Sequence, residues 1–389
     1  MSGRVIVVGS VNIDLVAHVP QLPHPGETVM GGTYQRHHGG KGGNQAVAVA
    51  RLGRPTLLIG AVGDDPFATD ARRALTAEHV DTSMVATLRG QPTGVALILV
   101  DSVGENEIAV VPGANGAIER GYVRDCLSRL GRLAGDVLLV CNEVPLEVVR
   151  EALTCGHAAG AITILNPAPA TGIDRSMFSL ADIVTPNRTE LDTLLKTDAK
   201  RSGLRPPAST DAAVRARALL TPAPDGPGVR RAVIVTLGAW GAAILQRVGS
   251  GLDGKPAPAH EPDLEADLGS PAGGSPSDGE SAVPAGSIAA TEPVPDSTTA
   301  TPPAGPRGKA TREPELNVWE VAAAKVFTVD STGAGDAFCG ALAVALAEGR
   351  PLIEAVNRAM VGGGLATTRN GAREGMPTGA ELEEFLARQ

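Results

Sequence analysis

The stretch that decides the fold is Val329-Asp330-Ser331-Thr332-Gly333-Ala334-Gly335-Asp336-Ala337-Phe338, which joins an expected strand over 325–329 to an expected apolar helix over 337–347. Two glycines two positions apart let the backbone turn tightly and point several N–H groups at one place. Because these groups precede a helix, the helix dipole favours an anion there. Asp336 stands in the same turn, where a carboxylate is explained if it takes a proton from a nucleophile that attacks the anion. An ordinary capped helix start explains the same residues equally well.

A second glycine-rich turn lies at 39–45 and precedes an expected helix over 46–52. Its Lys41 and Asn44 suit a polar ligand. It is not a Walker A loop, because Gly42 follows the lysine where Ser or Thr is required. The chain therefore has two glycine turns, each opening a helix.

Further polar side chains follow the expected strands. Asn12 and Asp14 come after the buried apolar run 4–8, at the strand end where open α/β sheets bind ligands. An ordinary turn is the alternative role for both. The adjacent His37 and His38 have no carboxylate or cysteine partner at metal-binding spacing, so a metal site is not expected there.

Composition excludes several functional classes. The chain has 389 residues, a net charge of −9 and 2% aromatic residues, which gives no basic surface for nucleic acid and few rings for base stacking. The four cysteines have no CxxC spacing and are expected to be reduced, which predicts a cytoplasmic protein. No secretory signal and no membrane-spanning run is expected.

Strands and helices are expected to alternate along most of the chain. Strands are predicted at 4–8, 57–61, 136–141, 161–165, 182–184, 231–236 and 242–246, and helices at 66–79, 118–133, 145–159, 351–368 and 379–387. This order predicts an α/β fold, a doubly wound, mostly parallel sheet flanked by helices. Segments 15–38 and 93–112 lack it and are expected to form a small β lid.

One domain is expected to span 1–389, interrupted at a hairpin tip by a low-complexity insertion. Residues 247–312 are rich in Pro, Ala, Gly, Ser and Thr and have no aromatic residue, so they are predicted to be disordered. A tolerated surface insertion is the favoured interpretation, and an effect on nucleotide access is the alternative.

The two turns together favour phosphoryl transfer to an alcohol. A dinucleotide fingerprint would need glycine at Phe338, which argues against a nicotinamide oxidoreductase. An anion-binding turn with a carboxylate, facing a turn with hydroxyl-binding groups, fits a reaction that depends on positioning and charge neutralisation.

These motifs resemble those of the ribokinase family of sugar kinases. The similar stretches are Gly9-Ser10-Val11-Asn12-Ile13-Asp14, Pro25-Gly26-Glu27-Thr28, the turn at 39–46, Leu165-Asn166-Pro167-Ala168-Pro169-Ala170, Thr185-Pro186-Asn187 with Glu190, and the opening stretch. They occur in the family's order and cover nearly the whole chain outside 247–312 and 197–211.

The resemblance implies a role for each matching residue. Asp336 is implied as the general base on the sugar's 5-hydroxyl, and the N–H groups of Gly333, Ala334 and Gly335 as the anion hole. The implied sugar-binding residues are Asn12, Asp14, Gly40, Lys41, Asn44, Glu143 and Asp336. The implied ATP-binding residues are Asn187, Thr236, Leu237, Gly238, Ala239, Trp240, Gly241, Gly335 and Asp336. The implied ligands of a monovalent cation are Asp330, Thr332, Ala366, Arg369, Gly371 and Gly375, and Glu190 is implied in magnesium or phosphate effects.

The resemblance also implies the substrates and partners. It implies D-ribose and ATP as substrates, magnesium with the ATP, potassium as an activating cation, and a homodimer through the lid. No nucleic acid or membrane partner is expected. A kinase for another sugar or a nucleoside remains the alternative within the family, and a non-catalytic sugar-binding regulatory protein is the alternative outside it.

Overall fold

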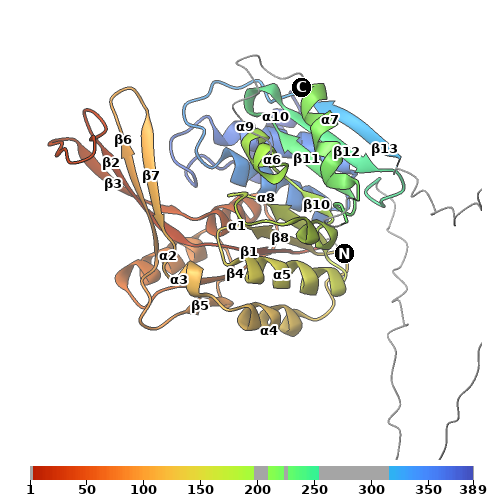
Figure 1. The fold of residues 1–389 in the computed structure, drawn as a ribbon, viewed down its shortest axis with the longest axis horizontal. Helices are drawn as coiled ribbons and strands as arrows, with labels where there is room; N and C mark the ends of the chain where they lie inside the picture. The colour runs from red at the N-terminus through yellow and green to blue at the C-terminus, as the bar shows by residue number, and fades with distance from the viewer. Residues whose placement is uncertain (1–2, 197–208, 223–226, 254–314, 389) are drawn as a thin grey trace, which may run out of the picture. The chain divides into compact units, whose positions relative to one another are not determined.

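A nine-stranded sheet forms the centre of the computed structural model, which describes residues 3–196, 209–222, 227–253 and 315–388 (Figure 1). The strand order is β13-β12-β11-β10-β9-β8-β1-β4-β5. All neighbouring strands are parallel except β12, which is antiparallel to both β11 and β13. The strands are β1 (Val5–Val8), β4 (Thr56–Val62), β5 (Val85–Thr87), β8 (Val137–Cys141), β9 (Ile162–Asn166), β10 (Ile183–Val184), β11 (Ala232–Thr236), β12 (Ala242–Arg247) and β13 (Leu316–Val321).

Helices cover both faces of this sheet. The helices are α1 (Lys41–Arg51), α2 (Pro66–Ala77), α3 (Ala114–Ala117), α4 (Arg120–Leu130), α5 (Leu146–Ala158), α6 (Arg188–Leu194), α7 (Ser209–Leu220), α8 (Ala334–Ala347), α9 (Leu352–Ala366) and α10 (Gly379–Leu386). Val5 and Val7 of β1 pack into the core with α1, α8 and α9, whereas Ile6 and Val8 pack into the core with α4, α5 and α7. Successive side chains of a strand point to opposite faces, so one apolar run supplies both cores. The doubly wound fold is confirmed.

A separate four-stranded sheet matches the predicted lid. Its order is β3-β2-β6-β7, with strands β2 (Asn12–His18), β3 (Thr33–Gly39), β6 (Gly94–Val100) and β7 (Asn106–Val111). β2 pairs parallel with β6, and the other two pairs are antiparallel. β2 begins four residues after β1 ends, so the lid starts directly at the carboxyl edge of the large sheet.

Three predicted elements differ in the structure. The strand expected over 325–329 is wrong: these residues form no strand, and Phe327 is 85% exposed. The sheet ends instead at β13, which pairs with β12. α1 begins five residues and α8 three residues earlier than expected, whereas the helix expected over 118–133 is observed as α4.

The hairpin that carries the predicted insertion is confirmed by the antiparallel pairing of β12 with β13. Residues 248–253 still belong to the described part, and Leu252 packs in the core there. The rest of the predicted disorder lies outside the described residues. All four cysteines are free thiols, as predicted. Among the described helices, none is both long and apolar enough to cross a membrane.

Candidate active site

The glycine turn before α8 lies beside a cavity of about 240 Å³. Gly333 has φ 78°, and a Cβ on it would lie 2.8 Å from the carbonyl oxygen of Ala372, so only glycine fits. Gly335 lines the cavity, and a Cβ on it would meet no atom within 4 Å. The turn therefore presents bare backbone at a helix N-terminus to an open space, as an anion site requires.

Two of the three predicted anion-hole donors keep their N–H groups unused. The N–H of Ala334 donates to the carbonyl oxygen of Ser331 at 3.2 Å. In the described part of the chain, Gly333 and Gly335 donate no such backbone hydrogen bond. These two glycines therefore leave N–H groups free for a ligand, whereas the N–H group of Ala334 closes the turn.

Asp336 sits in the first turn of α8 and is only 6% exposed. Its carboxylate accepts hydrogen bonds from Asn44 Nδ2 and Gln45 Nε2, both at 3.1 Å. Burial raises the pKa of Asp336, while the Lys41 ammonium opposes that rise. A fixed carboxylate with a raised pKa is suited to take a proton from a bound hydroxyl.

The donors to Asp336 come from the second glycine turn, at the start of α1. Lys41 and Asp336 line the same cavity, and the Asp336 charge is the main cause that raises the pKa of Lys41. The backbone N–H of Lys41 donates to Glu143 Oε2 at 3.1 Å. Ser10 Oγ donates to the same oxygen at 2.5 Å, so Glu143 is fixed at the carboxyl end of β8.

Asn12 and Asp14 lie at the start of β2, next to these groups. Asn115 Nδ2 donates to Asn12 Oδ1 at 2.8 Å and so sets the direction of that amide. Burial raises the pKa of Asp14 to about 6, although the charge of Arg373 opposes the change. The predicted sugar-binding side chains are therefore gathered in one region, where Lys41 and Asp336 are the ones that line the cavity.

Five of the nine predicted ATP-binding residues line a neighbouring cavity of about 210 Å³. It is lined by Asn187, Arg188, Thr189, Thr236, Leu237, Gly238 and Trp240. Asn187 and Thr236 also line the larger cavity, so the two spaces are adjacent. Gly241 does not line it: with φ 92° it packs on the backbone of Val321, where a Cβ would lie 1.9 Å from the carbonyl oxygen. Ala239 is not among the lining residues either.

Asn187 and Glu190 form a capping box at the start of α6. Asn187 Oδ1 accepts from the N–H of Glu190, and Glu190 Oε2 accepts from the N–H of Asn187, both at 2.8 Å. Burial raises the pKa of Glu190, which also lines the larger cavity. Local helix capping is thus one role for this pair, beside the predicted role toward magnesium and phosphate.

Five of the six predicted cation ligands come together between the α8 turn and the loop after α9. Asp330 accepts hydrogen bonds from the N–H of Thr332 at 2.9 Å and of Gly371 at 2.8 Å. Burial alone would raise the pKa of Asp330, but these hydrogen bonds hold it below its usual value. A Cβ on Gly375 would lie 2.3 Å from the carbonyl oxygen of Ala366 and 3.1 Å from that of Gly371.

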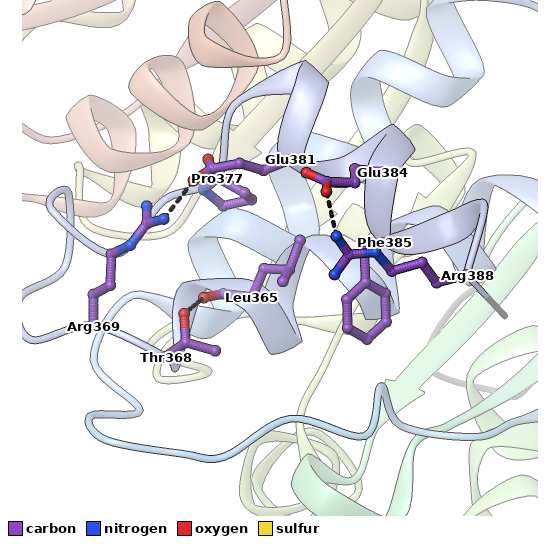
Figure 2. Close-up of a pocket in the computed structure, with 8 residues that line it drawn as sticks. All are labelled: Leu365, Thr368, Arg369, Pro377, Glu381, Glu384, Phe385 and Arg388. Carbon is purple, nitrogen blue, oxygen red and sulfur yellow. Dashed lines mark hydrogen bonds and ion pairs between the residues drawn. The ribbon is translucent and has the colours of Figure 1, made fainter.

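Arg369, the sixth, has its side chain elsewhere. Figure 2 shows its guanidinium paired with Glu381 of α10, in a separate pocket of about 160 Å³. Only the backbone of Arg369 is left for a cation. Oxygen atoms of a carboxylate and several carbonyls are suitable ligands for a hard cation, so the residues present fit the predicted ion.

Sequence reasoning assigned no role to three buried residues of the site. Gln45 bridges Asp336 and Asn166, whose Oδ1 accepts from Gln45 Nε2 at 3.1 Å. Both lie inside motifs used for the resemblance, so a signal for them was present. Arg373 is 5% exposed and donates to Asn44 and Gly39, but nothing in the local sequence marks it.

The chain is similar to known carbohydrate kinases in both sequence and fold. The model of the pfkB family carbohydrate kinases matches residues 2–261 and 305–379. A ribokinase of Schizosaccharomyces pombe is 30% identical over 386 residues, covering 98% of this chain and 96% of that protein. A ribokinase of Haemophilus influenzae is 29% identical, covering 99% of each. The crystal structure of a ribokinase from Thermotoga maritima superposes with a TM-score of 0.68 at 28% identity, covering 99% of each chain. The chain belongs to the pfkB family of carbohydrate kinases.

Proposed function

We propose that this kinase transfers the γ-phosphoryl group of ATP to the 5-hydroxyl of D-ribose, giving D-ribose 5-phosphate and ADP. The observation that carries the proposal is the position of Asp336. This buried carboxylate accepts hydrogen bonds from two amide donors and lies in the first turn of α8, directly after Gly335. The nearly full-length similarity to proteins called ribokinase supports ribose as the sugar.

In the proposed mechanism Asp336 accepts the proton of the 5-hydroxyl as its oxygen attacks the γ-phosphorus. The bond between that phosphorus and the bridging oxygen of ATP breaks, and ADP leaves. The N–H groups of Gly333 and Gly335 and the ammonium of Lys41 stabilise the charge on the moving group. Asn12, Asp14, Gly40, Asn44 and Glu143 hold the sugar so that its hydroxyl faces Asp336.

Metal ions enter this proposal in two places. Among the described residues, no group of three or more His, Cys, Asp or Glu side chains is arranged to hold a metal. Magnesium bound to ATP phosphates keeps several waters and needs few protein ligands, and Glu190, a carboxylate that lines the cavity, would be available to it. A monovalent cation such as potassium would be held by Asp330 and by the carbonyls around Gly375, where its charge supports the anion hole.

We also propose that the protein is a cytoplasmic homodimer that associates through the lid. Every residue of β7 is exposed, including the apolar Ile108, Val110 and Val111. An edge strand with exposed apolar side chains favours pairing with another chain. The free state of all four cysteines agrees with a reducing compartment.

ADP release measured against ribose, 2-deoxyribose, fructose and adenosine tests the function, with and without potassium. Rapid turnover on ribose with phosphate on O5 of the product is expected. Faster turnover of another compound of the panel would identify that compound, and not ribose, as the substrate. No turnover on any of them, together with retained ribose binding in calorimetry, would favour the regulatory alternative.

A further inference from the structure

Arg373 connects the loop after α9 to the glycine turn of α1. It lies between Gly371 and Gly375, and its side chain is 5% exposed. Nε donates to Asn44 Oδ1 at 3.0 Å, and Nη2 donates to the carbonyl oxygen of Gly39 at 2.8 Å. The guanidinium thus leaves its own loop and ends among the residues proposed to hold the sugar.

The first consequence concerns the Asn44 side chain. Its oxygen accepts from Arg373, and its nitrogen donates to Asp336 Oδ2 at 3.1 Å. A guanidinium has only donors and an ionised carboxylate only acceptors. An arginine on one side and the carboxylate on the other therefore allow a single orientation of the amide, which keeps its donor directed at Asp336.

The second consequence concerns charge. A Cβ on Gly39 would lie 2.1 and 2.2 Å from the carboxylate oxygens of Asp14, so Asp14 lies against the peptide that Arg373 holds. The charged groups that act on Asp14 are Arg373 and His37, which favour its ionised form, and Glu143 and Asp336, which oppose it. Arg373 has the largest effect of these four.

The third observation is an unused donor. Arg373 Nη1 is buried and has no hydrogen-bond partner among the described residues. A buried donor left unpaired destabilises the structure that contains it. A polar ligand bound beside Asp14 would offer it a partner, so this corner of the site is incomplete without one.

From these contacts we propose that Arg373 is a positioning residue for the sugar. It orients Asn44 toward Asp336 and supplies the counter-charge that Asp14 needs to bind sugar hydroxyls. The proposal rests on the proposed function, because the sugar site is part of it. It adds Arg373, a charged residue from the loop after α9, to the side chains that determine the affinity for the sugar.

The test compares Arg373→Gln with a matched control, Arg51→Gln. Arg51 Nη1 donates to the carbonyl oxygens of Arg373 and Met376, at 2.6 and 3.0 Å, and so anchors the same loop without contacting the sugar site. Arg373→Gln should raise the KM for ribose about tenfold or more and lower kcat less, since the two charge-assisted hydrogen bonds to Asn44 and Gly39 are lost from a buried site. Arg51→Gln should lower the Tm and leave the KM close to that of the parent.

The pH profile separates positioning from loop stability. As the pH falls, the KM for ribose should begin to rise at a higher pH in Arg373→Gln than in the parent, because Asp14 has lost its main counter-charge. Arg373→Lys should restore the pH dependence of the parent but only part of its affinity for ribose. An ammonium keeps the positive charge, but it does not have the planar donor geometry with which the guanidinium reaches Asn44 and Gly39. Equal KM values and pH profiles in Arg373→Gln and Arg51→Gln would overturn the proposal.

The test remains decisive if Arg373→Gln does not fold or if the parent enzyme is inactive. If Arg373→Gln does not fold, Arg373→Lys decides: a raised KM at parental Tm supports the proposal, and a parental KM overturns it. Activity of the parent enzyme in the same assay reports on the proposed function itself. A parent that binds ribose in calorimetry without phosphorylating it would contradict that function, and the ribose affinities of the variants would still test Arg373.

Discussion

The two glycine turns that open α1 and α8 look alike in sequence but use their glycines differently. At α1, a Cβ on Gly42 would lie 2.5 Å from the carbonyl carbon of Gly9, and one on Gly43 would lie 2.3 Å from Arg373 Nη2. At α8, a Cβ on Gly335 would meet nothing within 4 Å, and it would extend from a residue that lines the cavity. The glycines of the first turn pack against protein, whereas in the second turn Gly333 packs against Ala372 and Gly335 faces open space.

This difference teaches what each turn contributes. Close packing at α1 fixes the helix start, so that its side chains Asn44 and Gln45 reach Asp336 at defined distances. Open backbone at α8 leaves N–H groups free for a ligand. Glycine therefore serves structure in the first turn, and in the second turn it serves structure at Gly333 and ligand approach at Gly335.

The largest expected effect comes from the carboxylate between the turns. Asp336→Asn should lower kcat about 10²–10⁴-fold, because the proposed base is lost while the size of the side chain is kept. The Tm should change little, because two effects oppose each other. Burial raises the pKa of Asp336, so its charge costs stability at neutral pH and the neutral amide removes that cost, but the amide nitrogen cannot accept the hydrogen bond from Asn44 or Gln45 that a carboxylate oxygen accepted. ADP release and thermal melting measure the two quantities. Full activity of this variant would remove Asp336 from the mechanism.

A matched pair of alanine substitutions tests the comparison itself. Gly42→Ala should destabilise the protein by about 1–3 kcal/mol, because the new methyl group meets backbone atoms. Gly335→Ala should leave stability unchanged or higher, since alanine favours a helix, but lower kcat/KM about 10–100-fold by occupying the space of the phosphoryl group. Denaturant unfolding measures the stability of both variants, and steady-state kinetics measures their kcat/KM. The distinction between the turns would be wrong if Gly42→Ala lost only activity and Gly335→Ala lost only stability.

The smallest expected effect is a response to pH. Burial raises the pKa of Asp14 to about 6 and also raises that of Asp336, so both bind protons at milder acidity than ordinary carboxylates. kcat/KM for ribose should be constant above neutrality and fall as the pH drops through about 6. In Asp14→Asn only the contribution of Asp336 should remain. A profile unchanged down to the ordinary range of carboxylates would show that neither group controls the rate.

Much of the fold was predictable because its signals are local. Apolar runs such as Val5–Val8 are short, continuous and followed by turns, and this is enough to predict buried parallel strands. The prediction failed at 325–329, where three apolar residues among five lie mostly exposed outside the sheet. An apolar run reports the preference of a segment, and only the available sheet edges determine whether it pairs.

The site was predictable where residues lie in motifs and unpredictable where they do not. Asp336, Lys41 and Asn44 belong to the glycine turns, and the structure brings them together as expected. Arg373 stands 329 positions from Asn44 in a loop without a motif, so no local pattern could indicate their contact. The orphaned Nη1 atom likewise became visible only once the surroundings of the guanidinium were known.

The sequence alone determined the layered α/β architecture, the two helix starts and the chemistry of the groups placed there, because these depend on neighbours within a few residues. The tertiary structure decided which glycines face protein and which face open space, which predicted N–H donors are free, and which arginine enters the site. Those properties depend on atoms contributed by distant segments, and burial of a charge or a donor has a defined energy only when all its surroundings are in place.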